Sequence, residues 1–364
     1  MGLFKRKKPF RLSIRNRSLA FTPLGTRTVF VCIAVGAAAI NTGSNLLYLT
    51  VAMLLSMILL SGVLSEQALR RLVPKRRLPS EMYAGTPFPV VYTLRNNKRR
   101  MPSLALSVAS LYPGGQHGPA AFLARVGPGE EGDGRVSEAV AHRGEWLSSG
   151  FEISTRFPFG FFVKTLRVPH PETRLVYPQV RPLGQGMLDT LTAGLGEAPA
   201  QRKGHGQEIR GLRYYLPTDE ARIIHWKSSA RLSVLMAKEF EAQEKEGVTV
   251  ILDNFAPERP GPDYAGRFEE AVVLAASVVH HLLFTAEAPV SFMSRGMSIG
   301  PGTGRGHFML LMETLARIKP VHEEGPEDAL LDAFREGTCV LVLADNGSGW
   351  ARHKAGAALV LEAG

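Results

Sequence analysis

The strongest constraint on the fold of this chain is a run of 38 residues, from Thr28 to Ser65, that contains no charged side chain. As one helix this run would measure about 57 Å at ~1.5 Å per residue, well beyond the ~30 Å of bilayer hydrocarbon. Five turn-forming residues, Asn41 to Asn45, divide it into two apolar stretches. The sequence therefore predicts a transmembrane helical hairpin over residues 28–65, with its turn at residues 41–45.

Basic residues flank both ends of this run. Residues 1–27 contain eight Lys or Arg and no acidic residue, and residues 66–77 contain five basic residues and one acidic residue. These two segments together have a net charge of +12, whereas the whole chain has a formal net charge of +10, so the remaining residues have a net charge of −2. Lys and Arg beside membrane spans stay on the cytoplasmic side, and anionic lipid headgroups attract them. We therefore expect a basic cytoplasmic N-terminus over 1–27, both termini in the cytoplasm, membrane lipid as a partner through 28–65 and the flanking basic residues, and no nucleic-acid partner.

Two other interpretations of the apolar run remain. The run could form two buried helices in a soluble core, or it could be a signal peptide cleaved after the small residues Ala37 to Ala39. The hairpin is preferred because so long an uncharged stretch with basic ends is uncommon in soluble domains. Cys32 lies in the first span and Cys339 in a predicted buried strand, so we expect no disulfide, in agreement with a reducing compartment.

Residues 80–180 have the pattern of β structure. Short β-branched and apolar runs at 87–94, 103–111, 151–155 and 161–168 are separated by turn residues, and no useful helical period occurs. A small β-sandwich-like domain is the simplest fold for this pattern. A loose stretch rich in Gly and Ala, at 181–206, is then expected to be a linker.

The C-terminal residues 248–364 alternate strands with helices. Strands are expected at 248–253, 289–294 and 338–344, and helices at 268–284, capped by Asp263, and at 307–318. This order predicts a parallel α/β sheet. The glycines from Gly300 to Gly306 match neither nucleotide-binding spacing, so they are expected to form a flexible loop before a helix.

Residues 207–247 form a densely charged segment. Between Arg202 and Glu246, nine basic and seven acidic residues are interleaved, which favours ion pairs over a phosphate-binding surface. Thr218 or Asp219 could cap a short helix that runs to about Arg231, in which Ile223 and Trp226 share a face that can be buried. Residues 234–241 alternate as a half-buried strand does.

The charged segment resembles the signature of bacterial domain-of-unknown-function family fifty-eight. The matching residues are Arg213, Tyr214, Tyr215, Asp219, Arg222, His225, Trp226, Lys227, Arg231, Glu239 and Glu241. The hairpin turn Asn41-Thr42-Gly43, the Phe157-Pro158-Phe159-Gly160 turn and the pair Tyr177-Pro178 also resemble this family. The resemblance implies a protein of the bacterial cytoplasmic (inner) membrane, with a two-span anchor, a β domain and a von Willebrand factor A-like α/β domain. It also implies a MoxR-type AAA+ ATPase as a partner, and sometimes a transglutaminase-like membrane protein.

The resemblance also directs attention to Asp253. Where a von Willebrand factor A-like domain binds Mg²⁺, its first strand ends in Asp-x-Ser-x-Ser, whose oxygens complete the site. Here the run is Asp253-Asn254-Phe255-Ala256-Pro257, so only the aspartate is kept. We therefore expect a degenerate metal position, with no Mg²⁺ and no other cofactor.

These observations favour a membrane-tethered, non-catalytic adaptor that works with the ATPase. The alternative is a membrane-bound, hydrolase-like enzyme that uses Asp219 with His225 or Glu239, although no known catalytic spacing supports it. An internal brace between domains is expected, ahead of a docking surface, for Arg213, Asp219, Arg222, Trp226 and Arg231. The solvent accessibility of these side chains distinguishes the two.

Overall fold

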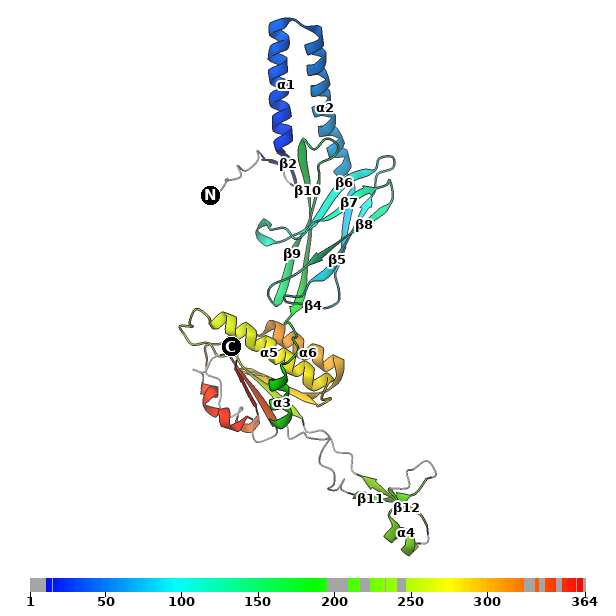
Figure 1. Cartoon of the computed structure of the whole chain (residues 1–364), viewed down its shortest axis with the longest axis vertical. Helices are drawn as coiled ribbons and strands as arrows, with labels where there is room; N and C mark the ends of the chain where they lie inside the picture. The colour runs from blue at the N-terminus through cyan, green and yellow to red at the C-terminus, as the bar shows by residue number, and fades with distance from the viewer. Residues whose placement is uncertain are drawn as a thin grey trace. The chain divides into compact units, whose positions relative to one another are not determined.

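The computed structural model describes residues 11–14, 16–194, 209–216, 223–232, 234–240, 247–323, 331–333, 338–344, 349–357 and 359–362 of the 364-residue chain. The chain divides into two compact units, Met1–Pro178 and Gln179–Gly364 (Figure 1). The first unit combines two long helices with β-sheets. The second is an α/β unit.

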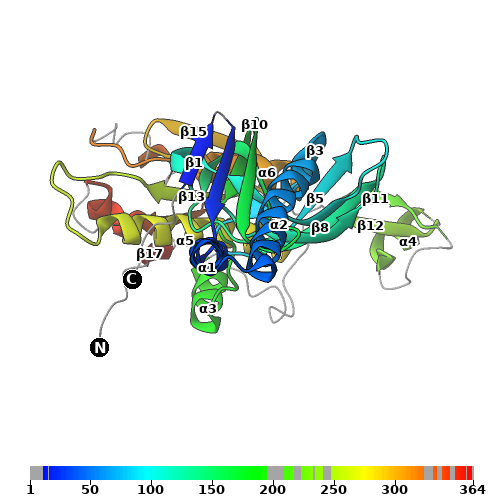
Figure 2. The same cartoon turned by 90° about the horizontal axis from the view of Figure 1, so that it is seen from above.

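The predicted hairpin is present in the first unit. Helix α1 spans Pro23–Thr42 and helix α2 spans Asn45–Leu69, and both are long and apolar enough to cross a membrane. The two helices lie side by side (Figures 1 and 2). Gly43 ends α1 with φ 65°, a left-handed conformation that glycine adopts without steric cost. The turn is where the sequence predicted it, but both helices extend beyond the uncharged run.

The basic N-terminal segment over 1–27 contains two strands that the sequence analysis did not predict. Strand β1 (Arg11–Ile14) pairs with strand β2 (Arg17–Phe21), and β2 pairs antiparallel with β10. Residues 1–10 lie outside the described part of the chain. The sequence did not reveal these strands because β10, the partner of β2, lies about 145 residues further along the chain.

A two-sheet β-sandwich follows the hairpin, as predicted, although it begins at Leu72 rather than near residue 80. One sheet has the order β1-β2-β10-β9-β6-β7, with β4 also paired to β10, and the other has the order β3-β5-β8. Tyr92, Leu106, Phe151 and Ile153 lie in the shared core and are almost fully buried. The strands are β3 (Leu72–Arg77), β4 (Met82–Tyr83), β5 (Phe88–Asn96), β6 (Ser103–Leu111), β7 (Ala121–Val126), β8 (Glu131–Glu138), β9 (Gly144–Thr155) and β10 (Phe162–Tyr177).

Lys98 joins the sandwich to the end of α2. Its buried ammonium group donates hydrogen bonds to the main-chain oxygens of Gln67 (2.7 Å) and Ala68 (3.3 Å), and to Ser103 Oγ (2.7 Å). Carbonyls in the last turn of a helix have no partner within the helix, and a lysine can satisfy them. The contact fixes α2 to β6, so the helix end cannot move independently of the sheet.

In the second unit, the expected linker is partly helical. Residues Gln185–Gly194 form helix α3, and its Leu191 is almost completely buried. The prediction of a loose stretch over 181–206 is therefore wrong for residues 185–194, and residues 195–206 lie outside the described part. Burial of a leucine against the rest of the unit stabilises a helix whose composition alone would not.

The C-terminal sheet has the order β15-β14-β13-β16-β17, with helices α5 (Tyr264–Phe284) and α6 (Gly304–Arg317). Every predicted strand and helix is present here, with slightly different ends. The Asp263 side chain, however, makes no capping hydrogen bond at the start of α5. The strands are β13 (Val248–Asp253), β14 (Val290–Ser294), β15 (Met297–Gly302), β16 (Thr338–Leu343) and β17 (Leu359–Glu362).

The sheet is mixed rather than wholly parallel. β13, β14, β16 and β17 are parallel, whereas β15 runs antiparallel to β14. The two residues Arg295 and Gly296, the latter with φ 77°, connect β14 to β15 in a tight hairpin. Gly300 to Gly302 therefore belong to a strand, and the prediction of a flexible loop is wrong for them.

Residues on β13 alternate between the two faces of this sheet. Val250 and Leu252 occupy one face, whereas Ile251 joins Leu341 and Trp350 in a second buried cluster on the other. Parallel strands are buried on both faces, which explains their almost continuous apolar sequence. Asp253, at the carboxyl end of β13, is two residues after Ile251 and therefore lies on the same face of the sheet.

Candidate functional site

The charged segment folds around a two-stranded sheet. Strand β11 (Ile209–Tyr214) pairs antiparallel with β12 (Met236–Phe240), and helix α4 (Trp226–Leu232) lies between them in sequence. Ser229 Oγ accepts a hydrogen bond from the Met236 N–H (2.9 Å) and donates one to the His225 carbonyl (3.1 Å), which joins α4 to β12. Ile224 and Ala237, both buried, form the centre of this small substructure.

His225 has a structural role at the start of α4. The ring Nδ1 of His225 accepts a hydrogen bond from the main-chain N–H of Ser228 (3.2 Å). The main-chain N–H of His225 donates to the Met236 carbonyl (2.8 Å). A neutral imidazole that accepts at Nδ1 carries its proton on Nε2. The ring therefore caps the helix, and its Nδ1 lone pair is not available to a reacting group.

Trp226 is exposed, contrary to the expectation that it shares a buried face with Ile223. Its side chain is 66% exposed and that of Tyr214 is 70% exposed. The α-helix begins at Trp226, whereas Ile223 lies in a 3₁₀ turn, and Ile224 and His225 are not helical as predicted. Ile223 and Trp226 therefore do not lie on one face of a common α-helix.

Several further large apolar side chains of the segment are exposed with Trp226. We call the set the exposed apolar cluster: Leu212, Tyr214, Leu216, Trp226, Leu232, Val234 and Leu235. Lys227 and Arg231 are exposed beside it, whereas Tyr215 and Arg213 are half-buried, and Arg213 donates to the Tyr214 carbonyl (3.1 Å). Concentrations of exposed apolar residues are typical of interaction surfaces.

The remaining signature residues can be placed only in part. Glu239 lies in β12 opposite Gly211. Asp219, Arg222 and Glu241 lie outside the described residues. The proposed catalytic pair of Asp219 with His225 therefore rests on sequence spacing alone.

The carboxyl end of β13 holds a buried ion pair. Arg295 Nε donates to Asp253 Oδ1 across 2.9 Å, and the exposed fractions of the two residues are 6% and 2%. The Arg295 guanidinium carbon lies 4.3 Å from the Trp350 ring centroid and 5.1 Å from that of Phe255. Stacking on aromatic faces suits the planar, weakly hydrated guanidinium.

These residues do not fit a magnesium ion. Asp253 Oδ1 also accepts from the Phe255 N–H (3.1 Å). The side chain of Asn254, the other candidate ligand, accepts from the Arg295 N–H (3.0 Å) and donates to the Lys319 carbonyl (3.0 Å). Mg²⁺ requires near-octahedral oxygen ligands, whereas here the candidate oxygens are engaged and a guanidinium supplies the positive charge. Among the described residues, no three His, Cys, Asp or Glu side chains gather as metal ligands would.

Sequence reasoning missed Arg295. The signal was its position directly after β14, because carboxyl ends of parallel neighbours meet at one edge of a sheet. A cationic residue there can reach the carboxylate at the end of β13.

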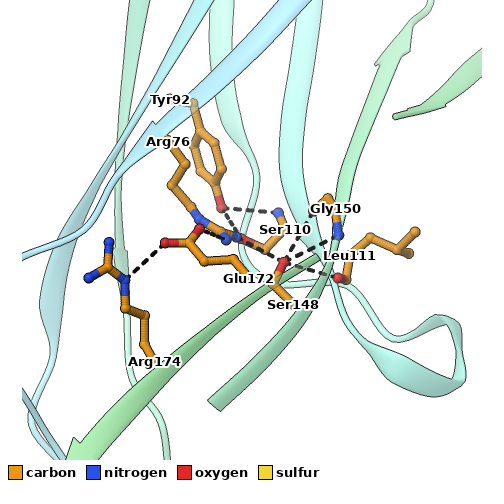
Figure 3. A network of polar contacts seen from close by, with 8 residues as sticks. All are labelled: Arg76, Tyr92, Ser110, Leu111, Ser148, Gly150, Glu172 and Arg174. Carbon is orange, nitrogen blue, oxygen red and sulfur yellow. Dashed lines mark hydrogen bonds and ion pairs between the residues drawn. The ribbon is translucent and has the colours of Figure 1, made fainter. Parts of the chain in front are cut away.

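A second buried polar network, also missed, joins the two sheets of the sandwich (Figure 3). Arg76 on β3 donates to Glu172 Oε2 on β10 (2.5 Å), to Ser110 Oγ on β6 (2.8 Å) and to Ser148 Oγ on β9 (3.0 Å). The Tyr92 hydroxyl lies 2.7 Å from Ser110 Oγ. The Arg76 side chain is 1% exposed. A buried arginine with this many partners fixes the register of one sheet against the other.

Burial shifts the pKa values of acidic groups around Arg76. Burial raises the pKa of Glu138 above its usual value, and the nearby Arg76 charge only partly offsets this. Burial also acts to raise the pKa of Glu172, but hydrogen bonds from Arg76 and Arg174 outweigh it and lower that pKa. Burial thus stabilises the neutral form of Glu138 relative to its ionised form, whereas the hydrogen bonds and charges of the two arginines stabilise the ionised form of Glu172.

The fold defines an α/β domain that carries a charged signature segment. Residues 211–352 match the family described as "Protein of unknown function DUF58", a region that covers most of this segment and the α/β sheet. The match supports the DUF58 family for this part of the chain.

A relative extends the similarity beyond the matched domain. The chain is 26% identical over 272 residues to "Uncharacterized protein YeaD" of Bacillus subtilis (strain 168), and the alignment covers 72% of this chain. The chain spans 66%, slightly under two thirds, of the length of that protein.

Proposed function

We propose that this chain is a membrane-tethered, non-catalytic adaptor that works with a MoxR-type AAA+ ATPase. Helices α1 and α2 would hold it in a bacterial cytoplasmic membrane, with both termini in the cytoplasm, because basic residues flank both outer ends of the hairpin. The exposed apolar cluster of the charged segment would dock the ATPase. A transglutaminase-like membrane protein is a second candidate partner.

The single observation that carries this proposal is the exposure of Trp226. Tryptophan is the residue most enriched at binding hot spots, and burying it on a partner releases a large apolar area. At 66% exposed, the Trp226 side chain is accessible to a partner, which supports a docking surface over an internal brace. Exposed Lys227 and Arg231 beside it would add charge complementarity to an acidic partner surface.

We further propose that the C-terminal domain is von Willebrand factor A-like, with an internal cation in place of a metal ion. This is supported by the first strand β13 lying between its parallel neighbours β14 and β16 and ending in Asp253. The Asp253–Arg295 ion pair occupies the position at which such a domain would bind Mg²⁺. Binding of a partner by this domain would then be independent of divalent cations.

Co-purification from detergent-solubilised membranes tests the adaptor proposal. The MoxR-type ATPase of the same organism should be recovered with the wild-type chain and lost with the double variant Tyr214→Ser/Trp226→Ser. The matched control is Phe122→Ser, because Phe122 is also 66% exposed but lies on β7 of the sandwich. Equal recovery with the double variant and the wild type would count against docking through this cluster.

Thiol labelling in intact cells tests the proposed orientation. Gln116 is exposed in the sandwich, so a Gln116→Cys variant offers an accessible thiol there. We expect an impermeant maleimide to label it only after the cells are permeabilised. Labelling in intact cells would place the sandwich outside the cytoplasm and contradict the proposal.

A further inference from the structure

Two adjoining pockets lie where α2 meets the sandwich. One, of about 480 Å³, and a second, of about 260 Å³, share Leu19, Glu66 and Lys164 as lining residues. Glu66 and Arg70 come from the end of α2, Arg17 and Leu19 from β2, and Lys164 from β10. We call these two cavities together the interface pocket. All of its described lining residues belong to the first unit.

The polar end of the interface pocket has excess positive charge. Among the described lining residues Glu66 is the only acidic one, and it forms ion pairs with Arg17, with Arg70 Nε (3.7 Å) and with Lys164 Nζ (3.4 Å). Three cations around one carboxylate leave a local charge of +2. Arg17 and Arg70 are about half exposed, so their guanidinium groups can reach a ligand.

Lys164 is the most buried of the three cations. Its ammonium group donates to the Gly62 carbonyl on α2 (2.7 Å), and its side chain is 15% exposed. Burial, together with the charges of Arg17 and Arg70, lowers the pKa of Lys164. An anion bound here would reduce this repulsion and would therefore be stabilised.

The other end of the pocket is apolar and continues along the membrane hairpin. Its wall consists of Ile58, Leu59 and Val63 on α2, with Phe162 at the start of β10. Helix α2 has 25 residues and is about 37 Å long at ~1.5 Å per residue. About 30 Å of this length crosses hydrocarbon, so roughly the last five residues, near Glu66, reach headgroup level.

We propose that the interface pocket binds one anionic phospholipid. Its phosphate would lie at Arg17, Arg70 and Lys164, and the part of an acyl chain nearest the headgroup would lie along Ile58, Leu59 and Val63. A soluble phosphate would satisfy the cations but not the apolar wall. A zwitterionic lipid would bring its own ammonium group into a site of charge +2. The inference rests on the membrane crossing proposed above.

The test uses the full chain in nanodiscs that contain phosphatidylcholine with a minor fraction of phosphatidylglycerol. Native mass spectrometry after release from the discs counts the lipids that stay bound. The wild type should retain one phosphatidylglycerol in preference to phosphatidylcholine. The Arg17→Gln/Arg70→Gln variant should bind it about 30-fold more weakly, since each basic residue near a membrane surface contributes roughly fivefold.

Two further variants separate a built site from general attraction. Lys75→Gln/Arg135→Gln removes the same charge from exposed positions on β3 and β8, and it should bind lipid like the wild type. Glu66→Gln removes the only acidic residue among the described lining residues and should strengthen binding. Equal weakening by Lys75→Gln/Arg135→Gln and Arg17→Gln/Arg70→Gln would overturn the site, as would weakening by Glu66→Gln with an unchanged unfolding midpoint in pure phosphatidylcholine discs.

The remaining outcomes distinguish a lipid phosphate from a soluble phosphate, and a failure of the lipid site from a failure of the proposed membrane anchor. Displacement of the bound lipid by millimolar inorganic phosphate would show that the pocket recognises soluble phosphate and would overturn the lipid proposal. Retention of the lipid in phosphate would support it. If the chain inserts into discs but shows no preference for phosphatidylglycerol, the lipid site fails while the membrane anchor stands. If the chain does not insert, both fail.

Discussion

Arg295 donates a hydrogen bond from Nε to the Oδ1 of Asp253 at 2.9 Å, and together they form an ion pair buried at the carboxyl edge of the α/β sheet. The two residues lie 42 positions apart in the sequence, at the ends of adjacent parallel strands. The guanidinium stacks on Trp350 and Phe255, which exclude water from the pair. The charge of the aspartate is thereby neutralised within the protein.

Removal of Arg295 should therefore destabilise the protein strongly. Arg295→Met leaves the Asp253 carboxylate buried without its partner, and breaking a buried pair in this way costs about 3–5 kcal/mol. Denaturant unfolding of the full chain in detergent measures the loss. The double variant Asp253→Asn/Arg295→Met should be less destabilised than Arg295→Met, because no unpaired charge remains. A double variant as unstable as the single one would contradict the electrostatic explanation.

Glu172 should make stability depend on pH in the acid range. Because its pKa in the folded state is lowered below 4.5, the stability that it contributes is present above pH 4.5 and is lost as the pH falls through that lower value. Glu172→Gln should cost about 1–3 kcal/mol at pH 7 and progressively less in acid. Glu131→Gln is the control, since Glu131 lies on β8 and is exposed. Unfolding midpoints between pH 3 and pH 7 provide the measurement.

Glu138 should have the opposite dependence. Its pKa is raised above 4.5, so its contribution to stability is present below pH 4.5 and is lost as the pH rises through the folded-state value. Glu138→Gln cannot ionise and should unfold at a higher temperature than the wild type at pH 7. The difference should disappear below pH 4.5. If the unfolding temperature of Glu138→Gln exceeds that of the wild type by the same amount at every pH, packing rather than ionisation is responsible.

Gly25 should tolerate no side chain. A Cβ at this position in α1 would collide with the backbone carbonyl of Phe161, which precedes β10. Backbone cannot move as a flexible side chain can, so Gly25→Ala should cost more than about 2 kcal/mol. Gly36, in the same helix, has only a distant contact with Val51, and Gly36→Ala should be nearly neutral. Thermal unfolding of both variants in the same detergent makes the comparison.

Cys339 should not react with alkylating reagents in the folded protein. Burial raises the pKa of its thiol to about 11, and its Sγ–H donates to the Ala333 carbonyl (3.1 Å). At pH 8 almost none of it is thiolate, the nucleophilic form. Mass spectrometry after iodoacetamide treatment should find Cys339 unmodified until denaturant is added. Modification under native conditions would show that β16 opens readily.

The apolar helical hairpin and the alternation of strands and helices after residue 248 could be predicted from the sequence. The first depends on a local property, the absence of charge over 38 residues, and the second on the periodicity of apolar residues within each element. The turn at Gly43 could also be predicted, because glycine and asparagine favour such a conformation wherever they occur.

The placement of Trp226 could not be predicted in this way. Spacing put it on one face with Ile223, but the hydrogen bonds of His225 and Ser229 to Met236 start the helix at residue 226 and turn the indole outward. A strand that follows ten residues later in the sequence therefore decides which face is buried. Helix propensity over seven residues is too weak to oppose it.

The sequence by itself determined which segments are apolar enough to enter lipid and which repeat as strands or helices, because each of these depends on neighbouring residues. Only the tertiary structure decided the partners of buried charges: Arg76 with Glu172, Arg295 with Asp253, and Lys164 with Glu66. Their partners lie between 42 and 98 residues away. The energy of a charge depends on what surrounds it in three dimensions, and that surrounding is set by the packing of whole sheets.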